Sequence, residues 1–584
     1  MILGKTDIDP SRFPALLDTA TWDRSAATAL ILRHRDAWPA VAKAGLRGKP
    51  PGRIPGGGLP RVSSVVARAG QVAFLAELPD TQKVFLQIGP PGGELLLGKP
   101  FFQLGLAEGL LLAAWPSDAA VIDLFCRTMA PPNAPRALGR TPRLGIGTRM
   151  TTRLWPGVFD AMDKKGFAAN AIQNSVRELN LLGDLRQGAP PERNYASGFG
   201  MIESGYTGST FEGLWVAGVL AALQHERPLA YGADADHIQL KRADPALERT
   251  LRVVDAARYY TFFTIDAADV LAYDALTGSA SGDELARAAI PDEKERREVL
   301  AWHAEAARAE AQRAGSGRRP VPIAADMVER CIGKYWAGLR ATGLLAEHVA
   351  ALRPGVPFDM EFAFDEHPPE IAGPDCITSD AECLFVAREI KRRGLPVTHL
   401  APNFGVEKGF DYRLADGIAG LEKRVAAQYR IAEEMGYLLD IHSADDLSSA
   451  TRRAIGRATE GRVHFKISPS LHMLFAETVR DSAPEVFALW WNDAVEYARA
   501  EAGRGSRFAA DCLAAWESGP GDRSPSPSQE VFRHFFFAYP GRRDPDGRFI
   551  NRQMLYELPA QLYRLYQERA SALLCALSDD LFAR

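Results

Sequence analysis

Two aspartates and a histidine stand within four positions of one another in the segment YGADADHI, residues 231–238. Asp234, Asp236 and His237 come directly after a short apolar stretch. Their side chains allow two interpretations. In the first, the carboxylates cap a turn or a helix start by accepting backbone N–H groups. In the second, carboxylate oxygen and imidazole nitrogen bind a divalent metal ion.

Similar groups recur at the ends of other apolar runs. They are Asp365, Glu366 and His367 in EFAFDEHPPE, His399 in VTHLAPNF, Asp440 and His442 in YLLDIHS, and Lys466 in VHFKIS. The chain has 11 histidines, and four of them fall at or just beyond candidate strands. We therefore predict a metal site with His237, His399 and His442 as ligands, to which Asp236 or Glu361 could add a carboxylate. Zinc, manganese and nickel all accept such ligands.

Each of these residues also has a simpler interpretation. A histidine on an apolar strand is more often a packed core residue than a ligand. His367 precedes two prolines, which favour an extended backbone, so it could simply close a loop. His464 shares a strand face with Lys466 and is a secondary candidate.

Acid–base and substrate-binding groups are expected near the metal. Glu203 lies in the glycine-rich segment MIESGYTGSTFEG, and a carboxylate near a metal could act as a general base. We predict Glu203, Asp236 and Lys466 as catalytic residues, with the Lys466 ammonium stabilising a developing enolate. Arginine can hold a substrate carboxylate through two parallel hydrogen bonds. The predicted substrate-binding residues are Arg149, Arg177, Glu361, Asn403, Lys408 and Arg413.

Eight apolar runs alternate with helical patterns and could position these groups. An alternation of this kind predicts an α/β fold, a (β/α)8 TIM-like barrel whose active site lies at the carboxyl ends of its strands. A doubly wound open sheet would have much the same pattern. The candidate strands are residues 142–148, 167–173, 228–238, 260–266, 357–364, 397–404, 437–443 and 463–468.

The barrel does not account for the whole chain. Residues 1–140 predict a partly β N-terminal extension of α+β type. The barrel is expected over 141–517, with a helical insertion at about 267–356 that is rich in Ala, Glu and Arg. Residues 518–584 predict a surface loop followed by helices packed on the barrel.

Composition excludes several other classes of protein. The chain has 584 residues, a formal net charge of −4 and a pI of about 6.3, so no broad affinity for nucleic acid or anionic membranes is expected. Six scattered cysteines without a CxxC pair indicate reduced thiols. The N-terminus lacks a signal-peptide pattern, and the longest apolar stretches are too short to span a bilayer. We expect a cytoplasmic protein, and the sequence leaves a homo-oligomer open.

The motifs together resemble the tagaturonate epimerase family. The resemblance covers residues 142–500 and is carried by YGADADHI, EFAFDEHPPE, THLAPNFGVEKGFDYR, DIHSADD, HFKISPSLH, IESGYTG and QNSVREL. It implies a metal-dependent (β/α)8 enzyme that interconverts tagaturonate and fructuronate at C4. It also implies His237, His399 and His442 as ligands, with Glu203 and Asp236 near the chemistry. Thr148 departs from the family pattern, which has Gly-Asp-Arg where this chain has Gly-Thr-Arg.

Inversion at C4 restricts the chemistry, because this carbon is β to the C2 ketone and its proton is not acidic by enolisation. Retro-aldol cleavage of the C3–C4 bond followed by re-addition is one route, and transient oxidation at C4 is another. Oxidation would use a nicotinamide, but no G-x-G-x-x-G follows a strand here, so we favour the retro-aldol route. Another metal-dependent sugar isomerase or aldolase, or a non-catalytic sugar-binding relative, remains an alternative.

Overall fold

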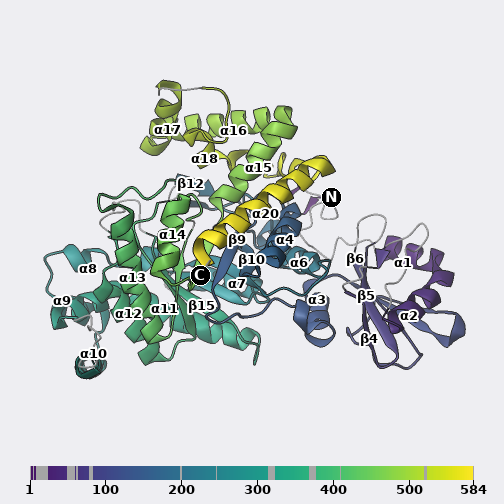
Figure 1. Cartoon of the computed structure of the whole chain (residues 1–584), viewed down its shortest axis with the longest axis horizontal. Helices are drawn as coiled ribbons and strands as arrows, with labels where there is room; N and C mark the ends of the chain where they lie inside the picture. Colours follow the sequence, from purple (N-terminus) through teal and green to yellow (C-terminus); the bar gives the residue numbers. More distant parts are fainter. Residues whose placement is uncertain are drawn as a thin grey trace.

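The structure is a computed structural model, shown in Figure 1. It describes residues 2–3, 6–7, 24–48, 59–60, 64–77, 83–196, 200–244, 246–313, 323–366, 376–407, 409–442, 444–518 and 523–582. The predicted residues His367 and Lys408 lie outside these ranges.

Eight parallel strands form a closed barrel in the order β9, β10, β13, β14, β15, β16, β17 and β18, and β18 pairs with β9. The (β/α)8 prediction is therefore confirmed, and each of the eight predicted segments overlaps one strand, although β10 and β13 run one or two residues further. The strands are Arg143–Gly147, Ala168–Ser175, Tyr231–Gln239, Phe262–Asp266, Asp359–Phe364, Val397–Pro402, Leu438–Ile441 and Val463–Ile467.

The barrel interior is polar, whereas most such barrels are filled by branched aliphatic side chains. Apolar residues alternate outward along the strands and pack under the helices, as Phe263, Ile265 and Phe465 do. The alternating inward positions carry charged and hydroxyl groups. Near the middle of the barrel these groups are Asp234, Thr264, Glu361, Asp440 and Lys466, and all are almost completely buried.

A bulge in β13 explains why neighbouring residues of YGADADHI both face the barrel mouth. The pairing of β13 with β14 shifts register between Ala235 and Ile238. Within the bulge, His237 has a φ of 57°, in the left-handed region that L-residues rarely adopt. The extra residue lets Asp236 and His237 both contribute to one site, which strict alternation would forbid.

Helices surround the barrel, and a run of helices separates β14 from β15. It contains α8 (Asp274–Thr277), α9 (Gly282–Ala289), α10 (Glu293–Arg313) and α11 (Ala325–Leu352). The other principal barrel helices are α4 (Trp155–Lys165), α6 (Phe211–Ala222), α7 (Glu248–Ala256), α12 (Asp380–Arg393), α13 (Gly417–Met435), α14 (Ser449–Ala458) and α15 (Pro469–Ser482).

The N-terminal extension is an antiparallel sheet in the order β3, β5, β6, β8, β7, with β4 paired to β5. Helices α1 (Arg24–Arg33) and α2 (Trp38–Leu46) pack with one face of the sheet. On the other face, Phe85 contacts Phe125 of α3 (Ala119–Thr128). The strands are Leu59–Pro60, Val66–Arg68, Gln71–Glu77, Lys83–Gly89, Phe102–Gly105 and Leu111–Pro116.

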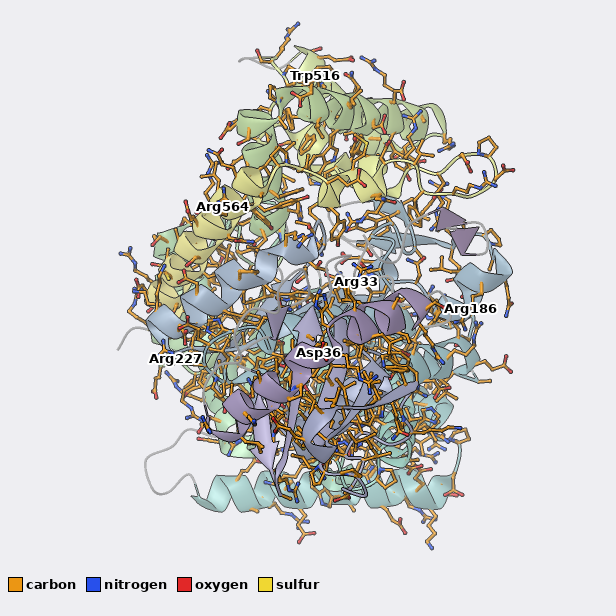
Figure 2. All side chains as sticks on the ribbon, turned by 90° about the vertical axis from the view of Figure 1, so that its right-hand side faces the viewer. Arg33, Asp36, Arg186, Arg227, Trp516 and Arg564 are labelled. Atoms are coloured by element: carbon orange, nitrogen blue, oxygen red, sulfur yellow. The ribbon has the colours of Figure 1, made fainter. Side chains whose placement is uncertain are left out.

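The C-terminal helices lie over the barrel and beside it. Helices α16 (Pro484–Gly503), α17 (Arg507–Ser518), α18 (Glu530–Phe535) and α19 (Ala538–Gly541) form a helical cap, which Trp516 marks at the top of Figure 2. The last helix, α20 (Ala560–Phe582), packs along α4. At their contact a Cβ on Gly157 would lie 2.4 Å from the Gln567 carbonyl oxygen. Among the described helices, none has the length and apolar character needed to cross a membrane.

Candidate active site

A polar cavity lies at the carboxyl ends of β9, β10, β13 and β18. This is the end of the barrel at which (β/α)8 enzymes hold their active sites. Its polar floor and walls come from the barrel strands and the loops that follow them, and aromatic residues from distant segments complete it. The lining includes Arg149, Gln173, Ser175, Arg177, Glu178, Tyr206, Asp236, His237, Lys466, Ser468, Phe536 and Phe537.

Lys466 is the centre of the charged network at the cavity floor. Its Nζ lies 2.9 Å from Asp236 Oδ1 and 3.3 Å from Asp234 Oδ2. It is also 3.4 Å from Glu361 Oε1 and 3.6 Å from Asp440 Oδ2. Burial alone would lower the pKa of Lys466, but the four carboxylates outweigh burial and raise it well above its usual value. The side chain is therefore a fixed cation rather than an amine nucleophile.

His237 joins the floor to the far wall of the cavity. Its Nδ1 lies 2.8 Å from Asp236 Oδ1, and its Nε2 lies 3.2 Å from Glu366 Oε1. Burial opposes protonation, but these two carboxylates raise the pKa of His237 to about 9. Glu366 also accepts two-pronged hydrogen bonds from the Arg177 guanidinium, at 3.0 and 3.2 Å.

His442 lies beside His237, with 4.8 Å between the ring centroids. Its Nε2 is 2.7 Å from Glu361 Oε1, and its Nδ1 is 3.1 Å from Asp365 Oδ2. Two of the three predicted metal ligands are thus neighbours at the mouth, although both are engaged with carboxylates.

The third predicted ligand, His399, lies deeper in the barrel. Its ring packs against Phe262 and lies 5.3 Å from the ring of His464. His399 is near the amino end of β16, whereas His442 follows the carboxyl end of β17. Among the described residues, no recorded contact joins His399 to His237 or His442, so the three imidazoles do not form a single cluster.

A different group has the geometry of a metal site. Ligand atoms of Glu361, Asp440 and His464 all lie within 4.8 Å of one another, and the three residues are buried. Within the described part of the chain, Glu361 Oε2, Asp440 Oδ1 and His464 Nε2 have no hydrogen-bond partner. Buried polar atoms are normally paired, and two carboxylates with an imidazole suit a divalent ion. These residues therefore fit a metal, one layer below the cavity floor.

The predicted catalytic residues fall in two places. Asp236 and Lys466 are in contact at the floor of the cavity. Glu203, at the end of β12 (Gly200–Glu203), instead lines a second cavity beyond Tyr206. The glycine-rich segment therefore brings Tyr206, rather than Glu203, to the barrel mouth.

The predicted substrate-binding residues are also divided. Arg149 and Arg177 line the cavity, and Arg149 Nε lies 2.7 Å from Glu178 Oε1. Glu361 lies beneath Lys466. Asn403 holds its own loop, donating to the Asp365 carbonyl and accepting from the Gly405 N–H. Arg413 is exposed, pairs with Glu407 and stacks on Phe410.

Several lining residues were not predicted from the sequence, among them Glu178, Tyr206, Phe536 and Phe537. Glu178 and Tyr206 come from loops after β10 and β12, and the QNSVREL and IESGYTG motifs contained a signal for both. Phe536 and Phe537 belong to the C-terminal cap, where His472 stacks on Phe536 with 3.9 Å between ring centroids. Nothing local in their sequence indicates that they reach the barrel mouth.

A polar cavity with a buried ionic network at the carboxyl end of a (β/α)8 barrel has the position of an enzyme active site. A sequence profile of the tagaturonate epimerase family matches residues 124–502. The chain belongs to the tagaturonate epimerase family, and it is therefore an isomerase of the epimerase class.

Solved structures support the fold. The native structure of fructuronate-tagaturonate epimerase UxaE from Cohnella laeviribosi matches with a TM-score of 0.62 at 18% identity, covering 90% of this chain and 96% of that one. A complex of the same protein with two glycerols gives a TM-score of 0.63, also at 18% identity, covering 90% and 97%. Among curated proteins, none matches this chain.

Proposed function

We propose that this enzyme interconverts tagaturonate and fructuronate by inverting C4. The observation that carries the proposal is the contact of Lys466 with Asp236 at 2.9 Å on the floor of a polar cavity. This contact puts a fixed cation beside a carboxylate at the end of the barrel where family members act. The Cohnella laeviribosi protein with the same fold is named a fructuronate-tagaturonate epimerase.

The substrate is a keto-uronate with one carboxylate, which needs a cationic partner. Arg149 and Arg177 line the cavity, and we assign the substrate carboxylate to these two residues. The neighbouring acids Glu178 and Glu366 fix the two guanidinium groups in place. Held in this way, the sugar presents C2 to C4 toward Asp236 and Lys466.

The proposed reaction is a retro-aldol cleavage followed by re-addition. The Asp236 carboxylate accepts the proton of the C4 hydroxyl, the C3–C4 bond breaks, and its electron pair forms an enediolate with the C2 carbonyl. The C4 aldehyde turns its other face toward C3, the bond re-forms, and Asp236 returns the proton to O4. No atom or electron is lost, so the cycle needs no oxidant.

Lys466 stabilises the negative charge that develops on the enediolate oxygen, since a preorganised cation in a dry site acts strongly on such charge. A divalent ion held by Glu361, Asp440 and His464 would supply Lewis-acid character beneath the same floor. We prefer this ligand set to His237, His399 and His442, because the three histidines are split between the mouth and the deeper layer.

The test uses tagaturonate carrying deuterium at C4. Retro-aldol chemistry leaves the C4–H bond intact, so NMR should detect fructuronate that retains deuterium, and the rate should change little. Transient oxidation at C4 would slow the reaction several-fold with this substrate. A purified protein that forms no fructuronate would overturn the substrate assignment, and a large isotope effect would overturn the route.

A further inference from the structure

A second cavity, larger than the first, lies between the barrel mouth and the helical cap. It has a volume of about 570 Å³ and is lined by the loop after α5 (Leu182–Gln187), the end of β12, α16, α19 and the segment that follows α19. Tyr206 and Phe537 line both cavities and form the wall between them. The second cavity is therefore next to the candidate active site but separate from it.

Arg543 is the unusual residue of this second cavity. Its guanidinium lies 4.2 Å from the ring centroid of Phe549, and its buried Nε has no hydrogen-bond partner within the described ranges. No ion pair of Arg543 is recorded among the described residues, and Glu203 acts on it only at longer range. Arg543 is half-buried, and a buried Nε without a partner is uncommon because buried polar atoms are normally hydrogen-bonded.

The neighbouring arginine of the same segment behaves differently. Arg542 pairs with Asp493, and its Nη1 lies 3.5 Å from Glu496 Oε2. The two adjacent arginines thus face the same cavity, one neutralised by acids of α16 and the other without a contacting anion. An anionic ligand could pair with the Arg543 guanidinium in the way that Asp493 pairs with Arg542.

The remaining lining restricts the ligand. The charged residues are four acids, Glu203, Asp493, Glu496 and Asp544, against Arg542 and Arg543. A multiply charged anion such as a phosphate ester would be repelled by this excess of carboxylates. A ligand with a single carboxylate could instead pair with Arg543 alone. Carboxylate oxygens accept hydrogen bonds from hydroxyl groups, and Tyr206, Tyr497 and Phe537 offer faces for a sugar backbone.

We propose that the second cavity is an outer binding site for a sugar acid, with Arg543 holding the ligand carboxylate and Glu203 accepting from its hydroxyls. The identity of the ligand rests on the proposed function, since the substrate itself is a polyhydroxy acid with one carboxylate. The outer site would hold such a molecule on the far side of Tyr206 and Phe537 from the catalytic floor.

Calorimetry with galactonate tests this proposal on the full chain. Galactonate is a six-carbon hydroxy acid without a ketone, so retro-aldol chemistry cannot consume it. Galactitol, which has no carboxylate, is the matched ligand control. We compare wild type with Arg543→Gln, and with Arg499→Gln as the control variant. Arg499 lies on α16 outside the cavity and pairs with Glu517 at 3.1 Å, so its loss removes the same charge elsewhere.

We expect wild type and Arg499→Gln to bind one galactonate more per chain than Arg543→Gln, and galactitol to bind at least tenfold more weakly than galactonate. Crystals soaked in galactonate should show it against Arg543. Equal stoichiometry in wild type and Arg543→Gln, or equal losses in both variants, would overturn the outer site. If wild type does not epimerise tagaturonate but Arg543→Gln still binds one galactonate fewer than wild type, the outer site is supported and the proposed function is wrong.

Discussion

Lys466 Nζ donates to Asp236 Oδ1 at 2.9 Å across 230 residues of sequence, joining β18 to β13 on the barrel floor. Three further carboxylates lie within 3.6 Å of the same ammonium. A single cation therefore neutralises part of an acidic cluster and also stands beside the proposed base. Because Lys466 has both roles, it is the first residue to replace by mutagenesis.

Lys466→Met should lower kcat by roughly 10²–10³, the usual loss when one preorganised charge is removed from a developing oxyanion. The variant also leaves acids unbalanced and should lower Tm, so Lys466→Arg, which keeps the charge, is measured beside it. A folded Lys466→Met protein with wild-type kcat would remove Lys466 from the mechanism.

Asp236→Asn should lower kcat by about 10²–10⁴ because the amide cannot accept the C4 hydroxyl proton. Asp234→Asn is the matched control, since Asp234 lies on the same strand but accepts from Thr264 in the layer below. Steady-state kinetics should give a clearly smaller loss for the control. Similar losses in both variants would indicate that charge balance, rather than proton transfer, limits the rate.

Metal content distinguishes the two possible ligand sets. Asp440→Asn should bind less divalent metal than wild type by elemental analysis, and His399→Ala should retain it. If His237, His399 and His442 are the ligands instead, His399→Ala should lose both metal and activity while remaining folded. Chelation of the wild-type protein should abolish epimerisation, and re-addition of the ion should restore it.

His237 has a positive φ, so its replacements should differ in stability according to their backbone preference. Asparagine tolerates the left-handed region, whereas β-branched valine does not. Both variants lose the imidazole, but His237→Val should be about 1–2 kcal/mol less stable than His237→Asn. Urea denaturation midpoints measure the difference. Equal midpoints would show that the bulge relaxes around the substitution.

Glu389 supplies a test of pH-dependent stability away from the active site. Burial raises its pKa, but hydrogen bonds from His303 and Arg392 outweigh burial and lower the pKa from 4.5 to about 2. A carboxyl group with a lowered pKa stabilises the fold at pH values above its pKa in the unfolded chain. This stabilisation is lost as the pH falls toward the pKa of the group in the folded protein. The stabilisation at neutral pH is of order 3 kcal/mol.

Glu389→Gln should therefore be much less stable than wild type at pH 7, with the difference shrinking between pH 4.5 and about 2. Denaturant titrations over this range measure it. Glu422→Gln, which breaks a more exposed pair with Arg457, should change stability by less than about 1 kcal/mol at any pH. A pH-independent loss for Glu389→Gln would show that packing, rather than charge, is responsible.

The sequence was sufficient to predict the barrel, because each strand is a short apolar run between helical patterns. It also identified Asp236, Lys466, Arg149 and Arg177, all of which line the cavity. The depth of each side chain was harder to predict. His399 and His442 look equivalent in sequence, yet one stands near the start of its strand and the other just beyond an end.

The contribution of the C-terminal helical cap to the cavity could not be predicted from local sequence patterns. Phe536 and Phe537 meet β9 and β10 at one cavity only because α16 to α19 fold back over the barrel. The β13 bulge is similarly invisible, since a period of two residues would turn His237 away from Asp236. Both features depend on tertiary packing, which propensity and alternation do not encode.

Phe536 and Phe537, which line the cavity, come late in the chain, and this order has a consequence for synthesis of the protein. The last barrel strand ends at Ile467, so all eight strands are translated before Phe536 and Phe537. The cavity gains its aromatic wall only when the last helices have been translated and docked. A chain that ended after β18 would lack this aromatic wall, and it would also lack α20, which packs along α4.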